Sequence, residues 1–422
     1  MHKLLLIAGA VAGARARTLA PWALPPAPTG AATPRGWYLR QLELQADGLT
    51  GHLAQFWDDV MASVWVGGDA DGGLHERAPY WMNGLVPLAF LLKNADGRHV
   101  RAGKTGVWQR AGFDRHAARA PGGDDALPPV DLMQQASDYV AAALAYRNAS
   151  SGWMGPDDSQ DTGNQYWSKF ELFLALTAWA DATPADAGAV DAAMRAHFGE
   201  QLRRMASVPL ESWAAARWQD GLLSVEWLLD RSAAARAAAG GGDDDGALWE
   251  LAELLRAQGV DWSAWFAAPT GDEHNVNLAQ GLKSGAAWHR VNASDDARAG
   301  AAESRARVAH LDAAFGLPTG MFNGDELTPS DDALARAPQR GVELCGVAEA
   351  MFSYATMLAA FGDASHADRL ERIAFNALPA TWASPTGGDM WAHQYLQAVN
   401  EMSATRRGDD YVWTHDNGDS ET

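Results

Sequence analysis

The feature that most constrains this chain is a helical periodicity that recurs along almost its whole length. Apolar residues keep an i, i+3, i+4 spacing in one segment after another, and turn residues such as Gly, Pro, Asp and Asn separate the segments. The sequence has no sustained period-two run rich in Val, Ile and Thr, and no alternation of strands with helices. The pattern predicts an all-α fold of helical hairpins, arranged as an open solenoid or a closed toroid.

The helices can be assigned by residue range. One or two helices are expected over residues 38–66, with a break near Asp47-Gly48, and another is expected to start at Asn83-Gly84, after a loop that holds Tyr80. Further helices are expected at residues 131–145, 167–181, 186–205, 210–229, 248–258 and 301–315. Residues 232–247, SAAARAAAGGGDDDGA, lack a periodic apolar face, so we expect them to form a surface loop.

Residues 341–378 place reactive side chains at the start of a helix. This stretch, GVELCGVAEAMFSYATMLAAFGDASHADRLERIAFNAL, holds the only cysteine, Cys345, two positions after Glu343. Its apolar spacing predicts one helix that stops at Gly362 and a second that begins directly afterwards. Glu343 and Cys345 would then lie at a helix N-terminus, where the dipole favours anions. The thiol alone could be a metal ligand, a nucleophile or a buried apolar group.

Composition and charge indicate which kinds of molecule the protein can bind. The formal net charge is −20 and no run of Lys or Arg offsets it, so we expect no nucleic-acid partner. The chain contains 19 Trp, and many of them lie beside Gly, Asp, Asn or Gln. Indoles in such positions suit the flat faces of sugars, although they also fill helix interfaces. The single cysteine excludes an intrachain disulfide.

The N-terminus predicts a secretory signal followed by a leader. Residues 1–20 combine a basic start, a short apolar run and small residues, although Arg15 and Arg17 interrupt the cleavage region. Residues 21–36 are rich in Pro, Ala, Thr and Gly, and we expect them to precede a fold that begins at residue 37. The apolar run is shorter than the ~20 residues that span a bilayer. We therefore expect a secreted protein without a membrane span.

Three further residues are candidates for chemistry on a sugar. Glycoside cleavage needs a proton donor to the leaving oxygen and a second group that attacks the anomeric carbon or activates water. Glu326, in a polar loop ahead of Glu343, could be the donor. His274 lies at the start of an expected helix, and Glu371 lies on the second helix of the hairpin. The alternatives are a solvated acid, a packed histidine and a surface ion pair, respectively.

Several of these motifs together resemble one enzyme family. The ELC triplet, GDASHADRLERIAFNAL and DMWAHQYLQAVN are similar to the β-L-arabinofuranosidases of glycoside hydrolase family 127 and their uncharacterised relatives. HERAPYWMNGLVPLAFLL and residues 272–281 and 413–422 extend the similarity over most of the chain. The resemblance implies an (α/α)6 barrel, a Zn²⁺ ion held by Glu and Cys residues, and a retaining mechanism with a metal-bound thiolate as the nucleophile.

The resemblance also implies roles for individual residues. Glu343 and Cys345 match the zinc-binding Glu-x-Cys, Glu326 matches the general acid/base, and His274 and Glu371 match sugar-binding residues. In the family, the nucleophile and a further zinc ligand come from a Cys-Cys pair downstream, and this sequence has one cysteine. We therefore expect a catalytic barrel over residues 37–422 that is cut short at its C-terminus, with an incomplete zinc site and impaired hydrolysis of plant-type or glycoprotein glycans.

Two alternatives remain open. The chain could be a complete paralogue that lost its cysteines and only binds glycans through its Trp-rich loops. It could also be another six-hairpin glycosidase or lyase, which would share the barrel and act on uronides. In each case the partner is an oligosaccharide or glycan, and neither the sugar nor the oligomeric state follows from the sequence.

Overall fold

The computed structural model describes residues 17–70, 75–105, 126–156, 162–239, 245–292, 296–324, 326–330, 341–381, 390 and 396–397. Over these residues the protein is mostly helical, which confirms the all-α prediction. The strands of this part are short antiparallel pairs: β1 (Val100–Arg101) with β4 (Val130–Asp131), β2 (Lys104–Thr105) with β3 (Ala126–Leu127), and β5 (Val342–Glu343) with β6 (Leu396–Gln397).

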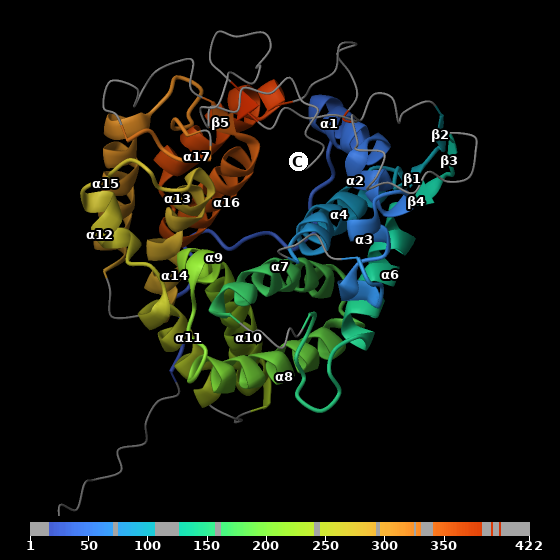
Figure 1. Cartoon of the computed structure of the whole chain (residues 1–422), viewed down its shortest axis with the longest axis horizontal. Coiled ribbons are helices and arrows are strands. Elements are labelled where there is room, and N and C mark those ends of the chain that lie inside the picture. Colours follow the sequence, from blue (N-terminus) through green and yellow to red (C-terminus); the bar gives the residue numbers. More distant parts are fainter. Residues whose placement is uncertain are drawn as a thin grey trace, which may run out of the picture.

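One series of helices packs in chain order, each helix against the next (Figure 1). It comprises α4 (Arg77–Asn94), α7 (Tyr166–Ala182), α10 (Trp218–Ala239), α14 (Ser284–Val291) and α16 (Leu344–Phe361). The short helix α13 (Asn275–Gly281) also packs closely against α16. Because these helices are buried on most sides, α7 carries apolar residues around its whole circumference, interrupted by the buried Lys169 and Glu171.

A second set of helices packs against the first. It comprises α6 (Leu132–Ala145) on α4, α8 (Ala187–Met205) on α7, α11 (Gly246–Gln258) on α10, α15 (Ala297–Phe315) on α14, and α17 (Ala364–Arg372) on α16. The short helix α12 (Trp262–Ala267) lies against α15. The predicted hairpins are therefore present, and Gly362 ends α16 in the left-handed conformation as expected.

The beginning and the end of the described chain are neighbours. The helix α1 (Gly36–Asp47) carries Trp37 and Tyr38, whose rings lie 5.4 and 5.9 Å from the ring of Phe375 in η4 (Ile373–Ala377). Just after α1, the backbone N–H of Leu49, the first residue of α2 (Leu49–His52), donates to the carbonyl of Met390 at 3.1 Å. The expected break near Gly48 is present between α1 and α2. Short helices follow at η1 (Leu53–Gln55), α3 (Asp58–Met61) and η2 (Val64–Val66).

Among the described residues, only α16 is long and apolar enough to cross a bilayer. Core helices of other proteins share this composition, and half of α16 is buried against α13, α14, α15 and α17. The absence of a membrane span stays a prediction.

Three expectations about element boundaries are wrong. α4 begins at Arg77, so Tyr80 and Asn83 lie inside the helix because apolar residues such as Trp81 and Met82 pack against the core. The helix expected at residues 210–229 is divided at Arg217 into α9 (Ser212–Ala216) and α10. α10 then continues to Ala239 through residues expected to form a loop, since alanine favours the helix without a packed face.

The expected leader lies against the helices. The backbone N–H of Ala20 donates to the carbonyl of Arg290, and that of Leu24 donates to the carbonyl of Ala359. These bonds join residues 20–24 to α14 and α16. Residues 1–16, on which most of the predicted signal falls, lie outside the described part.

Candidate functional site

Three segments that are far apart in sequence are joined by backbone hydrogen bonds where α13 and α16 begin. The N–H of Asn275 donates to the carbonyl of Glu326 at 2.7 Å, and the N–H of Thr328 donates to the carbonyl of Glu273 at 2.9 Å. On the other side, the N–H of Glu343 donates to the carbonyl of Gly324 at 3.1 Å. We call residues 272–276, 322–328 and 341–346 the site junction, residue 325 being outside the described part.

The site junction is closed around one buried amide. Asn275 is fully buried between Gly324 and Gly346. A Cβ atom at Gly346 would lie 1.8 Å from the Asn275 Oδ1 atom, and one at Gly324 would lie 2.4 Å from its Nδ2 atom. Glycine is therefore required on both sides of Asn275, which explains two glycines in the predicted site segments.

Glu326 occupies a strained backbone position in this junction. Its φ angle is +80°, a left-handed conformation that is uncommon for residues other than glycine. Its side chain is half-buried, and its carbonyl is held by Asn275. Strain of this kind is retained where the surrounding structure fixes it, and it is concentrated at functional sites.

Glu343 and Cys345 interact directly at the start of α16. The thiol of Cys345 donates a hydrogen bond to the Glu343 carboxylate. Burial, followed by the negative charge of Glu343, holds the pKa of Cys345 well above its usual value, and Arg217 opposes this effect. The thiol therefore stays protonated in this structure, and a protonated thiol is a poor nucleophile.

His274 begins α13 and lies beside a tryptophan. Its ring centroid is 4.6 Å from that of Trp213, in an edge-to-face arrangement. Burial, together with the charge of Arg217, lowers the pKa of His274 to about 3. The imidazole is therefore neutral near pH 7, and it can exchange hydrogen bonds with hydroxyl groups without adding charge.

A group of buried polar side chains adjoins the site junction, and we call it the central cluster. Arg217 donates from Nε to Oδ1 of Asn277 at 3.1 Å and from Nη1 to the hydroxyl of Tyr80 at 3.3 Å. Its guanidinium lies over the rings of Trp167 and Trp213, 4.5 and 5.0 Å from their centroids. Since Arg217 also affects the pKa values of His274 and Cys345, it connects the cluster to the junction.

The central cluster also contains three carboxyl groups and one lysine. Lys283 is fully buried, with Nζ 2.8 Å from Oδ1 of Asp220 and 3.6 Å from Oε2 of Glu349. Burial raises the pKa of Asp220 to about 6 despite the nearby Lys283. Burial, and then the charges of Glu349 and Asp220, raise the pKa of Glu171 well above its usual value. Asn83 donates to Glu171 from α4 at 3.3 Å.

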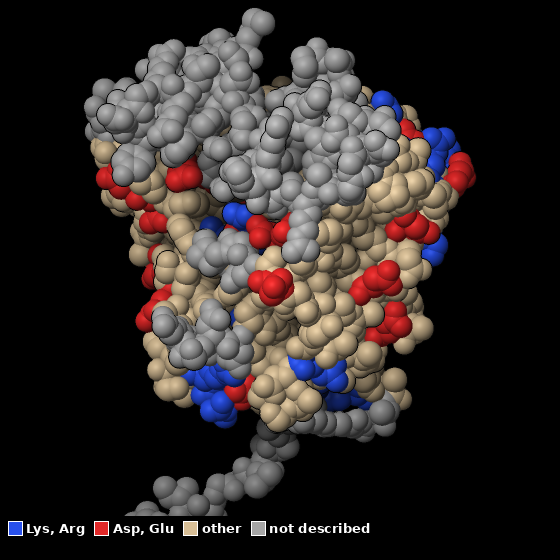
Figure 2. All heavy atoms as spheres, turned by 45° about the vertical axis from the view of Figure 1, so that its right-hand side comes forward, with Lys and Arg blue, Asp and Glu red and all other residues tan. Residues whose placement is uncertain are grey.

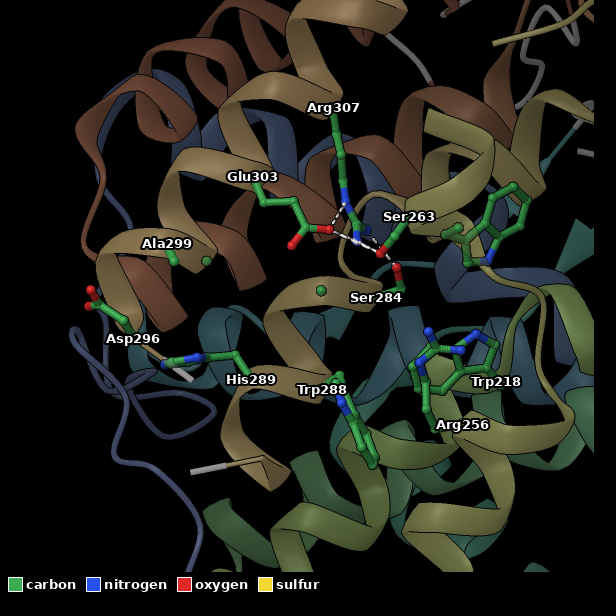
Figure 3. A pocket seen from close by; sticks show the side chains of 13 residues that line it. Trp218, Arg256, Ser263, Ser284, Trp288, His289, Asp296, Ala299, Glu303 and Arg307 are labelled. Carbon is green, nitrogen blue, oxygen red and sulfur yellow. Dashed lines mark hydrogen bonds and ion pairs between the residues drawn. The ribbon is translucent and has the colours of Figure 1, made fainter. Parts of the chain in front are cut away.

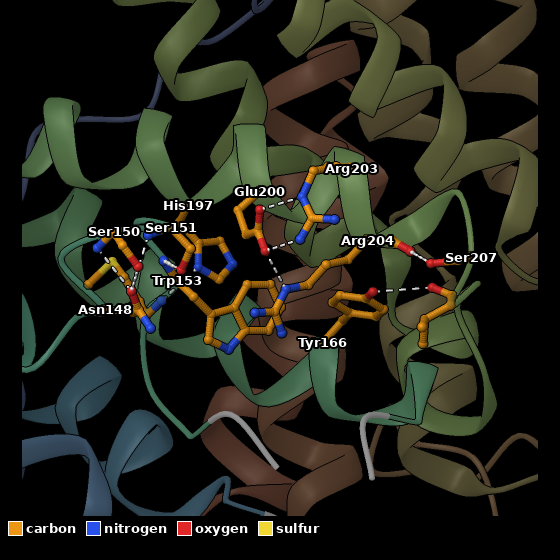
Figure 4. A network of polar contacts seen from close by, with 12 residues as sticks. Asn148, Ser150, Ser151, Trp153, Tyr166, His197, Glu200, Arg203, Arg204 and Ser207 are labelled. Atoms are coloured by element: carbon orange, nitrogen blue, oxygen red, sulfur yellow. Dashed lines mark hydrogen bonds and ion pairs between the residues drawn. The ribbon is translucent and has the colours of Figure 1, made fainter. Parts of the chain in front are cut away.

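A second polar network, which we call the α8 network, joins α8 to the loop before α7 (Figure 4). His197 stacks on Trp153 with ring centroids 4.4 Å apart, and its Nδ1 accepts from the backbone N–H of Met154 at 2.9 Å. Glu200 accepts from Nε of both Arg203 and Arg204, each at 2.8 Å. The bond from Arg203, aided by Arg204 against a burial penalty, lowers the pKa of Glu200 to about 2.

The structure brings four of the five predicted site residues into one junction. Glu326, Glu343, Cys345 and His274 all belong to it, whereas Glu371 is exposed on α17 and no described contact joins it to the junction. Sequence reasoning did not select the central cluster. Some of its members are single charged residues inside helices rich in apolar residues, as Glu171 in SKFELFLAL, and this pattern was the available signal.

The described residues do not complete a zinc site. Glu343 and Cys345 supply one carboxylate and one thiol, and no group of three or more His, Cys, Asp or Glu side chains suited to a metal occurs in the described part of the chain. A structural zinc site needs four ligands, and a catalytic one usually has three from the protein. The donor set seen here therefore does not fit a closed zinc site.

The charged side chains of the surface are more dispersed than those of the central cluster. On the face shown in Figure 2, acidic side chains are scattered, and basic ones gather mainly near its lower edge and at its upper right.

A comparison of the sequence with models of known protein families gives no match, and a search of curated proteins also gives none.

Proposed function

We propose that the chain is the helical barrel of a glycoside hydrolase of the β-L-arabinofuranosidase type, in which Glu326 is the general acid/base. The observation that supports this most is the site junction, because backbone bonds hold the segments of His274, Glu326 and Glu343 together. Beside it, the central cluster offers the buried hydrogen-bonding groups that a polar substrate needs.

We also propose that the helices form an (α/α)6 toroid. Two observations support this arrangement. The first is the series α4, α7, α10, α14 and α16, each with an outer partner helix. The second is the contact of Trp37 and Tyr38 with Phe375, which brings α1 next to η4, near the end of the described chain. A closed ring of inner helices directs their polar side chains toward one centre, where the central cluster would lie.

In this proposal the chain's own residues bind the sugar and supply a proton. Arg217, Tyr80 and Asn277 orient hydroxyl groups, and neutral His274 hydrogen-bonds a further one. Glu326 donates its proton to the glycosidic oxygen as the bond to the anomeric carbon breaks, and a water molecule adds to that carbon and gives up a proton to solvent. The family's Cys-Cys pair has no counterpart in this sequence, which has one cysteine, so we expect slow hydrolysis.

Zinc binding by Glu343 and Cys345 is a separate part of the proposal. With two ligands, we expect a dissociation constant weaker than about 1 µM, far from the affinity of closed structural sites. Competition for Zn²⁺ with a chromophoric chelator measures this constant. Binding in the nanomolar range that is lost in C345S would show that further residues complete the shell.

The rival function is a barrel that binds glycans without cleaving them. The single cysteine of the sequence favours it, because a retaining enzyme needs an activated nucleophile and the family's Cys-Cys pair has no counterpart here. A lyase or uronide hydrolase of the same architecture is distinguished by its activity on uronides.

The decisive experiment compares E326Q with the wild type on phenyl β-L-arabinofuranoside, whose leaving group needs protonation. We expect the wild type to release phenol above the background rate and E326Q to be at least about 100-fold slower. E250Q, which changes an exposed acid on α11, is the matched control and should keep the wild-type rate.

Equal rates for the wild type and E326Q would refute the acid/base role. No hydrolysis by either protein, with methyl β-L-arabinofuranoside still bound, would favour the glycan-binding rival. Neither hydrolysis nor binding would overturn the proposed substrate class.

A further inference from the structure

A cavity of about 260 Å³ lies between α10, α11, α12, α14 and α15, and no residue of the central cluster or of the site junction lines it. Figure 3 shows its side chains. The lining includes Trp218, Arg256, Ser284, Trp288, Glu303 and Arg307. We call it the α15 pocket. Three of its lining residues are Gly or Ala, which leaves the space open.

One wall of the α15 pocket is a preorganised polar network. Arg307 is buried, and its Nη1 donates to the hydroxyl of Ser284 at 2.8 Å while its Nη2 contacts Oε1 of Glu303 at 2.6 Å. Ser263 donates to the same Oε1 atom at 3.0 Å. In Figure 3 the other oxygen of Glu303 points away from Arg307 and Ser263, toward the side of Ala299. The wall thus presents a fixed acceptor for hydroxyl groups.

Much of the remaining lining is aromatic. Trp218 and Trp262 are almost fully buried, and the indole N–H of each donates a hydrogen bond to a backbone carbonyl. The guanidinium of Arg256 lies over the ring of Trp218, 5.5 Å from its centroid. Trp288 is the half-buried indole of the lining, and Figure 3 shows it beside Arg256, below the polar wall. Its ring is therefore the surface on which a flat ligand can stack.

The charges of the α15 pocket select against a strongly ionic ligand. The lining carries Arg256 and Arg307 against Asp296 and Glu303, and Arg307 is already paired with Glu303. Arg256 lies 3.4 Å from Asp261. An anionic ligand would compete with these carboxylates for the arginines, and a cationic ligand would compete with the arginines for the carboxylates. A neutral ligand with several hydroxyl groups and one apolar face suits both parts of the lining.

We propose that the α15 pocket binds a single neutral sugar unit, stacked on Trp288 and hydrogen-bonded to Glu303. The pocket is separate from the site junction, so this inference does not rest on the proposed function. It adds a second place where the protein can hold a glycan.

The test uses methyl glycosides of D-galactose, D-xylose and L-arabinose, with D-glucuronate as an anionic comparison. Their binding is followed by tryptophan fluorescence and by saturation-transfer NMR. A299L places a larger side chain at an exposed helical position of the lining, and A309L makes the same change on α15 outside it. E303Q is a second variant that keeps the shape and removes the charged acceptor.

We expect at least one neutral glycoside to bind with millimolar affinity, about tenfold more weakly to A299L and E303Q, and unchanged to A309L and E326Q. Absence of binding by all three neutral glycosides would overturn the proposal. So would equal affinity for A299L and A309L, or tighter binding of D-glucuronate than of every neutral glycoside.

Discussion

The central cluster and the α8 network are both networks of polar side chains, yet the pKa values of their carboxyl groups are shifted in opposite directions. In the α8 network, Arg203 and Arg204 both form ion pairs with Glu200, and the pKa of that carboxyl falls to about 2. In the central cluster, burial raises the pKa of Asp220 to about 6, even though Lys283 lies 2.8 Å away. A network that only holds a loop in place can satisfy its charges fully.

The two networks also differ in where their residues come from. The α8 network joins one helix to the loop that carries Trp153, so its side chains come from only two neighbouring segments. The central cluster takes side chains from α4, α7, α10, α13 and α16 and places carboxyls with perturbed pKa values beside one another. Perturbed titratable groups that converge from many elements mark functional-site candidates. The difference thus separates a structural network from a candidate site.

The largest expected effect follows from the removal of Lys283. K283M leaves Asp220 and Glu349 buried without their cation, and breaking such a pair costs about 3–5 kcal/mol of unfolding free energy. In the α8 network, R203M removes a mostly exposed partner of Glu200 and should cost much less. Urea unfolding of both variants measures the difference. Similar losses for K283M and R203M would contradict the contrast between the networks.

The pH dependence of stability should have opposite signs in the two networks. The pKa of Asp220 is raised from 3.8 to about 6, so the folded state binds the extra proton and its contribution is lost as the pH rises through 6. The pKa of Glu200 is lowered from 4.5 to about 2, so its contribution is lost as the pH falls below 4.5.

Chemical denaturation from pH 3 to 7 tests both signs. The stability difference between the wild type and D220N should shrink as the pH rises from 4 to 6, whereas that between the wild type and E200Q should shrink as the pH falls from 5 to 3. A D220N difference that grows as the pH rises from 4 to 6 would show that Asp220 is ionised more easily in the folded state than in the unfolded state.

The sequence predicted many of the helices, and the resemblance selected most of the candidate residues of the site junction. The spacing of apolar residues predicted α6, α7, α8, α11 and α16 nearly to their ends, because the buried stripe of each helix follows from residues that are close in sequence. The resemblance selected Glu326, Glu343, Cys345 and His274, and their segments meet through backbone bonds. The roles of these residues stay predictions.

The rest depends on contacts that are distant in sequence. Arg217 is significant because it lies between Tyr80 and Asn277, which come from helices far apart in the chain. The charged residues of the central cluster resemble surface charges until packing shows that the surrounding helices bury them. The α15 pocket likewise lies between α10, α11, α12, α14 and α15, so no single segment indicates it.

The most direct test of the account is the affinity of methyl β-L-arabinofuranoside for R217K and R204K, measured by isothermal titration calorimetry. Lysine keeps the charge of Arg217 but cannot bond Asn277 and Tyr80 together, so we expect about tenfold weaker binding. R204K makes the same change in the α8 network and should bind like the wild type. Equal affinities for R217K and R204K would contradict the claim that the central cluster is part of the sugar-binding site.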